Sequence, residues 1–190
     1  MAQATLLERP AGPVDPETEP ETACPSEPAM TSTAVLFTDI VGSTALQLAR
    51  GDCGWRDLIL AHHALVRASL DRWHGFENDT AGDGFYVTFP EPGDAVRCAL
   101  EAVDTVRPLG IAIRAGVHVG ECTIADRKCS GLTVSIGSRI TARAGAGEVL
   151  VSKVVRELVP APDLEFTDAG LHRLKGVPGR WQLFSVRVGR

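Results

Sequence analysis

Two aspartates stand where apolar stretches meet tight turns, and their chemistry is the first clue to a function. Asp39 ends the apolar run in AVLFTDIVGST, and Asp83 lies in TAGDGFYVTF just before another apolar run. Such runs predict buried strands, which would hold both carboxylates rigidly at neighbouring strand ends. Hard oxygen ligands suit Mg²⁺ or Mn²⁺ carrying a nucleotide triphosphate. Gly42 and Ser43 follow Asp39 as a phosphate-cradling turn requires, which favours a metal site over two ordinary turn residues.

Strands and helices alternate along the segments that position these aspartates. Ser43 is expected to cap a short helix that breaks near Gly51, and Asp94 to cap a later one. Because a hairpin around Gly82 and Asp83 requires an antiparallel pair, we predict a mixed sheet and an α+β class. The expected strands, besides the one ending at Asp39, are 76–81, 84–89, 111–120, 149–152, 164–167 and 181–188. The expected longer helices are 52–73, 94–106 and 130–144, with a short helix at 153–158.

Two adjacent histidines, His62 and His63, lie on the amphipathic helix predicted over 52–73. Adjacent helical positions point about 100° apart, and no carboxylate lies one turn away to complete a metal site. We therefore expect His62 to serve packing and His63 to face solvent. His118, on the strand predicted over 111–120, is likewise expected to be packed rather than catalytic.

Charge is spread unevenly over the 190 residues. Residues 1–30 contain six of the twelve prolines and six acidic residues but one basic residue, so this segment accounts for the whole net charge of −5. Such a composition buries too little apolar surface to offset the entropy of ordering, and predicts a disordered tail followed by one domain over 31–190. Met30 is a second candidate for the initiating residue.

Composition also excludes several classes of protein. No run approaches the ~20 apolar residues of a membrane span, and the N-terminus lacks a basic region followed by an apolar run, so we expect a cytoplasmic protein without membrane contact. A neutral domain without a stripe of basic residues lacks the positive surface that binds nucleic acid. Five cysteines without CxxC spacing argue against both zinc and disulfides.

Six strings in order over residues 33–188 resemble the catalytic domain of class III adenylate and guanylate cyclases of the bacterial, mycobacterial-like type. They are FTDIVGST, TAGDGF, IRAGVHVGE, SIGSR, GEVLVS and LKGVPGRW. The resemblance implies a ferredoxin-like mixed sheet flanked by helices, with active sites between two head-to-tail protomers of a homodimer. It also implies that ATP or GTP is converted to a 3′,5′-cyclic nucleotide and pyrophosphate, with cAMP favoured over cGMP.

The resemblance assigns roles to residues of this chain. Asp39, Asp83 and the backbone of Ile40 match the family's metal site, which holds two Mg²⁺ or Mn²⁺ ions. No other residues in the sequence compete with Asp39 and Asp83 for this role. The family's triphosphate-holding turn corresponds to three residues: Gly42, Ser43 and Thr44.

Three basic residues match phosphate-binding positions of the same family. Arg139 in SIGSR corresponds to the arginine that stabilises the transition state and reaches in from the opposite protomer. Arg114 in IRAGVHVGE and Lys175 in LKGV correspond to contacts with the triphosphate. Four residues before Arg139, where the family has an asparagine or histidine that orients the ribose, this chain has Ser135, whose shorter hydroxyl predicts slower turnover.

The base-recognition pair departs further from the family. A lysine is usual three residues before Gly82 and an aspartate seven residues before Ser135, whereas this chain has Asp79 and Lys128 there. Three hypotheses remain: a compensated swap that still binds a purine, an ion pair between the two that blocks the base pocket, or an alignment slip in which Asp126 recognises the base. The choice between ATP and GTP stays open at this stage.

Two other functions compete with an active cyclase. A nucleotide-binding, regulatory homologue with weak or no turnover would explain the departures at Ser135, Asp79 and Lys128, but not the retention of Asp39, Asp83 and Arg139. A diguanylate cyclase would need a GG[DE]EF-like turn, and the chain has AGDGF instead.

Overall fold

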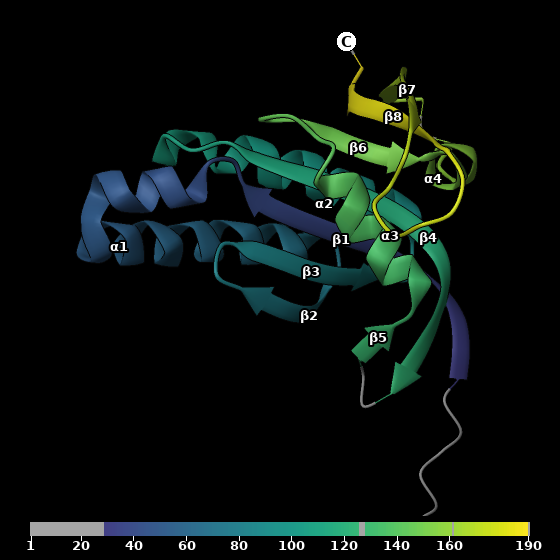
Figure 1. Cartoon of the computed structure of the whole chain (residues 1–190), viewed down its shortest axis with the longest axis horizontal. Helices are drawn as coiled ribbons and strands as arrows, with labels where there is room; N and C mark the ends of the chain where they lie inside the picture. The colour runs from purple at the N-terminus through teal and green to yellow at the C-terminus, as the bar shows by residue number, and fades with distance from the viewer. Residues whose placement is uncertain (1–28, 126–127, 161, 190) are drawn as a thin grey trace, which may run out of the picture.

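The computed structural model describes residues 29–125, 128–160 and 162–189. They form a sheet with helices packed on it (Figure 1). The strands are β1 (Ala29–Ile40), β2 (Phe76–Ala81), β3 (Gly84–Phe89), β4 (Ile113–Ala125), β5 (Lys128–Ser130), β6 (Val149–Ser152), β7 (Leu164–His172) and β8 (Trp181–Val188). The helices are α1 (Ser43–Arg72), α2 (Pro92–Thr105), α3 (Leu132–Thr141) and α4 (Lys153–Leu158), with a 3₁₀ turn η1 (Arg107–Leu109).

The sheet is mixed, as predicted. Its strand order is β2-β3-β1-β4-β6-β8-β7, and β5 pairs with β4 off this path. The β4–β6 pair is parallel and the other pairs are antiparallel. The α+β class is therefore confirmed, and β1 lies between β3 and β4 in the middle of the strands that carry the candidate site.

Alternation along β1 decides which face each side chain serves. Ala34 and Leu36 are buried in the core that includes residues of α1 and α2. Val35 and Phe37 point to the opposite face, where they pack with Val134 of α3. By the same alternation, Asp39 lies on the α3 face of the sheet.

Helix α3 packs close to the sheet because glycines lie on both sides of the contact, Gly137 on the helix and Gly120 on β4, each against a side chain from the other side. A Cβ atom built on Gly137 would lie 2.7 Å from Cγ2 of Val35, and one on Gly120 would lie 2.5 Å from Oγ1 of Thr133. Neither glycine has a positive φ, so close packing rather than backbone conformation explains both. This close packing fixes the distance between the sheet and α3, the helix that carries Ser135 and Arg139.

Two helix starts differ from the prediction. The N-cap of α1 is Gly42 in a left-handed conformation (φ 70°, ψ 29°), so Ser43 is the first helical residue and not the cap. The N-cap of α2 is Glu91, and Asp94 lies in the first turn, where a carboxylate is favoured by the helix dipole. The predicted break at Gly51 is confirmed by its non-helical φ of 68° and ψ of 170° inside α1.

The strands beyond the middle of the chain are longer than expected. β4 extends to Ala125 and pairs with β5, which the sequence did not predict. Within this pair Cys122 and Cys129 form a disulfide, so the expectation of no disulfide was wrong. The sequence gave no CxxC signal because the pairing of β4 with β5, and not a short motif, brings the two cysteines together.

Other differences are confined to element ends. α3 is shorter than the predicted 130–144, and β7 continues to His172. Ala29 and Met30 already belong to β1, and the rest of the predicted tail, 1–28, lies outside the described residues. In the part of the chain that the structure describes, none of the helices has the length and apolar character needed to cross a membrane.

Candidate active site

The two aspartates meet because β1 pairs with β3, which places the end of β1 beside the β2–β3 turn. The backbone N–H of Ile40 donates to Oδ2 of Asp83 over 3.1 Å, which ties the turn to the strand end. Burial and, second, the negative charge of Asp39 raise the pKa of Asp83. Two carboxylates that repel each other in this way form a donor set that a divalent cation would stabilise.

The start of α1 lies next to this carboxylate pair. The Ser43 side chain forms a hydrogen bond with Asp83, which partly offsets the rise in the pKa of that carboxyl group. Gly42 and Thr44 are exposed. Because the first N–H groups of a helix lack intrahelical partners, this exposed end fits the predicted contact with phosphate. The structure thus brings the three predicted turn residues to the side of the carboxylate pair.

Arg114, the predicted triphosphate contact on β4, bonds to Asp39. It lies opposite Asp39 in the β1–β4 register, and its Nε and Nη2 donate to Oδ2 of Asp39 over 3.0 and 2.5 Å. Both side chains are about one-third exposed (31% and 35%), so solvent weakens the pair. Both bonds reach the same oxygen, so Arg114 leaves Oδ1 of Asp39 unbonded on its side of the pair.

Arg139 and Lys175 lie side by side at the end of α3. The Nε of Arg139 donates to the backbone oxygen of Lys175 over 3.3 Å. One turn further on, Nη2 of Arg143 donates to the backbone oxygen of Arg173 over 2.6 Å. These two bonds fix the loop that carries Lys175 against α3. Ser135, one turn before Arg139, is exposed on the same helix.

A small pocket within one chain is lined by residues of β1, β4 and α3. It has a volume of about 240 Å³, and Asp39, Arg114 and Arg139 are among its lining residues. This is below the ~300–1,000 Å³ typical of ligand pockets. The family resemblance predicts that Arg139 serves the partner's site, and in the structure the arginine borders a pocket of its own chain.

A second pocket of about 340 Å³ contains Asp79. Phe37 and Tyr86 line it as a stacked pair, with ring centroids 4.6 Å apart and an interplanar angle of 2°. Oδ1 of Asp79 accepts a hydrogen bond from the backbone N–H of Thr80 over 3.0 Å.

None of the ion pairs among the described residues joins Asp79 to Lys128. The hypothesis of a blocking ion pair therefore has no support within one chain. Asp126, the residue of the alignment-slip hypothesis, lies outside the described residues.

Residues that the sequence did not single out hold β5 and therefore Lys128. The backbone N–H of Cys129 donates to Oδ1 of Asn78 over 3.1 Å, and the Tyr86 hydroxyl donates to the backbone oxygen of Cys129 over 2.8 Å. Asn78 is adjacent to Asp79 in β2. The same two bonds therefore hold the strands that carry Asp79 and Lys128. These bonds join residues 43 and 51 positions apart, so no local sequence signal could have revealed them.

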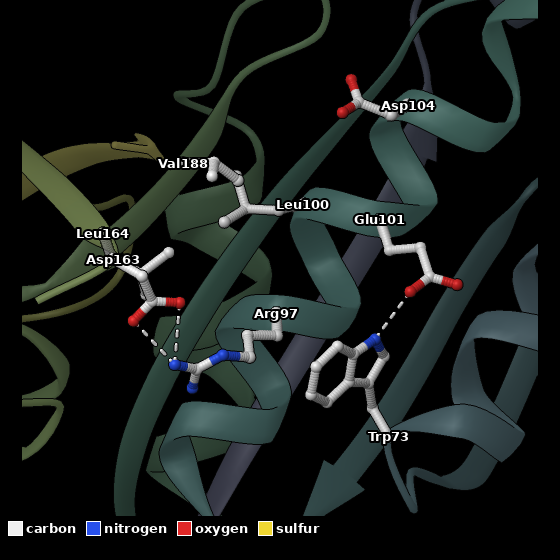
Figure 2. A pocket seen from close by; sticks show the side chains of 8 residues that line it. All are labelled: Trp73, Arg97, Leu100, Glu101, Asp104, Asp163, Leu164 and Val188. Atoms are coloured by element: carbon white, nitrogen blue, oxygen red, sulfur yellow. Dashed lines mark hydrogen bonds and ion pairs between the residues drawn. The ribbon is translucent and has the colours of Figure 1, made fainter. Parts of the chain in front are cut away.

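A third pocket, of about 270 Å³, lies away from these residues (Figure 2). Nη2 of Arg97 on α2 bonds to Asp163 over 2.9 Å, and Nε1 of Trp73 donates to Glu101 over 2.9 Å. None of the residues that line it is a predicted site residue. Its described interactions join α1 to α2 and α2 to the segment before β7, which indicates a structural role.

The family comparison matches most of the chain. Residues 26–187 match the model of the adenylate and guanylate cyclase catalytic domain. A putative adenylate cyclase of Rhizobium meliloti is 30% identical over 154 residues, covering 76% of this chain and 26% of the relative. A pH-sensitive adenylate cyclase of Mycobacterium tuberculosis is 37% identical over 117 residues, covering 58% and 29%. The chain thus spans about a quarter of the length of these curated relatives.

Solved structures share the fold. The adenylyl cyclase CyaB from P. aeruginosa superposes with a TM-score of 0.77 at 23% identity, covering 86% of this chain and 97% of that one. The guanylate cyclase domain of RhGC from Catenaria anguillulae in complex with GTP gives a TM-score of 0.73 at 22% identity, covering 84% and 97%. The family match over residues 26–187 means that the chain belongs to the adenylate and guanylate cyclase catalytic domain family.

Proposed function

We propose that this chain is a purine nucleotide cyclase that converts ATP or GTP to a 3′,5′-cyclic nucleotide and pyrophosphate, with ATP as the favoured substrate. The observation that carries the proposal is the meeting of Asp39 and Asp83 beside the exposed start of α1, in a chain of this family. The names of its curated relatives, several of which are adenylate cyclases, support ATP. We further propose a cytoplasmic role in intracellular signalling.

The donor set fits two Mg²⁺ or Mn²⁺ ions. Asp39 and Asp83 would supply carboxylates and the Ile40 backbone a carbonyl. Burial and, second, the charge of Asp39 raise the pKa of Asp83, and a bound cation would stabilise its ionised form. Bound there, the ions would lower the pKa of the ribose 3′-hydroxyl and neutralise the departing pyrophosphate. The exposed N–H groups around Gly42 and Thr44 would hold the β- and γ-phosphates.

The reaction is an in-line displacement at the α-phosphorus. The 3′-oxygen loses its proton and bonds to phosphorus, while the bond from phosphorus to the bridging oxygen of the β-phosphate breaks and pyrophosphate leaves. Arg139 would donate to the oxygens on which negative charge develops, and Lys175 beside it would hold the triphosphate. Ser135 would contact the ribose from the same helix, directly or through water.

Three observations support a homodimer with shared sites. The pocket that holds Asp39 and Arg139 in one chain has only about 240 Å³, too small to enclose a nucleoside triphosphate. Arg139 is exposed, and its Nε bonds to a backbone oxygen rather than to an acidic group. Ser135 is exposed on the same helix. A second protomer related by a twofold axis would complete two equivalent sites, with Arg139 donated across the interface.

Base recognition would fall to Asp79 and Lys128. A carboxylate accepts from the amino group of adenine or from N1–H of guanine, and an ammonium donates to N1 of adenine or O6 of guanine. Because the two are not paired with each other in one chain, both remain available to a purine. The stacked Phe37 and Tyr86 rings in the pocket of Asp79 would form an apolar wall for it.

The second candidate is a nucleotide-binding regulatory dimer with weak or no turnover. One observation favours it: Arg114 forms an ion pair with Asp39, the residue that an active enzyme needs for metal. A product assay distinguishes the two functions. Wild-type protein is incubated with ATP or GTP in Mn²⁺ or Mg²⁺, and cyclic nucleotide is separated and quantified. Cyclic product from either nucleotide supports the cyclase, and its absence with both supports the regulatory dimer.

A further inference from the structure

The turn that carries Asp83 lies against two adjacent histidines of α1. Nε2 of His62 lies 3.4 Å from the backbone oxygen of Asp83, and Nε2 of His63 lies 3.0 Å from that of Gly82. A carbonyl oxygen only accepts hydrogen bonds, so each ring donates its Nε2–H. Two successive side chains of one helix thus bind two successive carbonyls of one turn. His63 is therefore partly buried against the turn, so the expectation that it faces solvent holds only in part.

Packing alone does not explain His62. The residue is fully buried, and its Nδ1 has no hydrogen-bond partner among the described residues. Burial and, second, the charge of His63 lower the pKa of His62 to about 4, so the ring is neutral at neutral pH. An unpaired buried ring nitrogen is destabilising, and an apolar side chain of similar size would avoid that cost. Such a side chain would lack the Nε2–H bond to the turn.

The same two rings also contact Phe85, and this contact is the alternative explanation for their presence. The centroids lie 5.8 Å from His62 and 5.1 Å from His63, in edge-to-face geometry. An apolar residue could pack on Phe85 equally well. A substitution that keeps the N–H donor and one that does not therefore separate the two explanations.

The turn needs support from the helix side. It joins β3 to β2, the edge strand of the sheet, and a Cβ atom on Gly82 would meet nothing within 4 Å, so the tip is open on that side. The carboxylate of Asp83 is moreover repelled by Asp39. Helix α1, by contrast, is anchored in the core by three buried apolar residues: Leu58, Val66 and Leu70.

We propose that His62 and His63 are positioning residues for Asp83, whose bonds to the turn carbonyls keep its carboxylate beside Asp39. The inference rests on the metal site of the proposed function, and it places neither ring in contact with substrate. His63 offers the cleaner test because it is only partly buried, so its replacement disturbs the core less than a change at His62.

The test compares His63→Leu, which removes the donor, with His63→Gln, which retains an N–H donor on a side chain of similar reach. Mn²⁺ binding to nucleotide-free protein is titrated by electron paramagnetic resonance, and kcat is measured separately at saturating Mn²⁺. One lost hydrogen bond predicts that His63→Leu binds Mn²⁺ about 3- to 10-fold more weakly. His63→Gln should bind like the wild type, and kcat at saturating Mn²⁺ should change less than about twofold.

His172→Leu is the matched control. Nε2 of His172 also donates to a backbone oxygen, that of Ala169, over 2.9 Å, but it lies on β7 at the opposite edge of the sheet from β2. This variant should retain wild-type Mn²⁺ affinity. The inference is overturned by unchanged Mn²⁺ affinity in His63→Leu, by equal losses in the Leu and Gln variants, or by an equal loss in His172→Leu.

The outcomes also separate this inference from the proposed function. If wild-type protein binds Mn²⁺ through Asp83 and His63→Leu binds it more weakly, yet the wild type forms no cyclic nucleotide, the positioning role is upheld and the cyclase is rejected. If the wild type is an active cyclase but His63→Leu binds Mn²⁺ normally, the cyclase is upheld and the positioning role is rejected. A wild-type protein that binds no Mn²⁺ overturns both.

Discussion

Arg114 lies directly across the β1–β4 pair from Asp39 and donates two hydrogen bonds to one oxygen of its carboxylate. The arginine thereby lowers the negative charge at the site where a cation would bind. A metal ion carrying a nucleotide brings both a cation for the aspartate and phosphates for the arginine. The pair is therefore suited to opening when substrate and metal arrive together.

Replacing Arg114 by glutamine should separate these two contributions. Without the guanidinium, Asp39 is no longer neutralised, so Mn²⁺ should bind nucleotide-free protein up to about fivefold more tightly, the value of a partly exposed ion pair. The KM for nucleotide should rise, because a phosphate contact is lost. Mn²⁺ titration and steady-state kinetics check both effects, and weaker Mn²⁺ binding by Arg114→Gln would show that the pair does not compete with metal.

Mixing inactive variants tests whether the sites are shared. Asp39→Ala should abolish metal binding in its own site, and Arg139→Ala should remove the transition-state donor that it supplies to the partner. A heterodimer of the two contains one intact site if Arg139 crosses the interface. Cyclic-nucleotide formation should therefore recover toward a quarter of the wild-type rate at equal mixing, assuming random exchange of protomers.

The same mixing experiment has a clear negative outcome. If Arg139 serves the pocket of its own chain, as its place beside Asp39 in the small pocket would permit, neither chain of the heterodimer holds an intact site. Activity then stays at the level of the separate variants. Exchange of protomers, followed with differently tagged chains, is the control that makes this result interpretable.

Charge exchange between Asp79 and Lys128 tests their role in base recognition. Asp79→Lys combined with Lys128→Asp restores the arrangement usual in the family, and should raise kcat/KM for ATP by about 10-fold or more, since a hydrogen bond to a charged group contributes roughly 1.5–3 kcal/mol. Each single variant places like charges in the pair and should be slower than the double variant. A double variant with unchanged ATP and GTP kinetics would exclude both residues from base recognition.

Gly137 tests the close contact between α3 and the sheet. In Gly137→Ala, the new Cβ would lie 2.7 Å from Val35, so the helix must shift, and overpacking of this kind costs about 1–3 kcal/mol of stability. Gly93→Ala is the matched control on α2, where the nearest atom is the end of the flexible Arg97 side chain at 3.4 Å. Chemical denaturation should show destabilisation in the first variant and none in the second; equal stabilities would mean that α3 adapts freely.

Features that depend on a short stretch of sequence were predictable, whereas features that depend on contacts between distant segments were not. The hairpin with Asp83 at its tip was predictable because a Gly-Asp turn between two apolar runs is a short-range pattern. The break of α1 at Gly51 was predictable for the same reason. Bonds between distant segments were not: Arg114 and Asp39 are 75 residues apart, and their pairing depends on the register of β1 and β4.

The predictions that failed, wholly or in part, share this cause. His63 was expected to face solvent because helical periodicity describes one helix and not the turn packed against it. β5 has three residues, too few for a period, and its pairing with β4 also creates the disulfide. Roles for Arg139, Ser135 and Lys175 came from resemblance to a family, and the structure adds that Arg139 and Lys175 are in contact.

Metal binding by the two aspartates tests the central claim most directly. Mn²⁺ is titrated, by electron paramagnetic resonance, into wild-type protein and the Asp39→Asn and Asp83→Asn variants in the presence of an ATP analogue that cannot cyclise. We predict two Mn²⁺ ions per site in the wild type and at least about a 10-fold loss of affinity in each variant, because each removes a charged ligand. Equal Mn²⁺ binding by all three proteins would contradict the account.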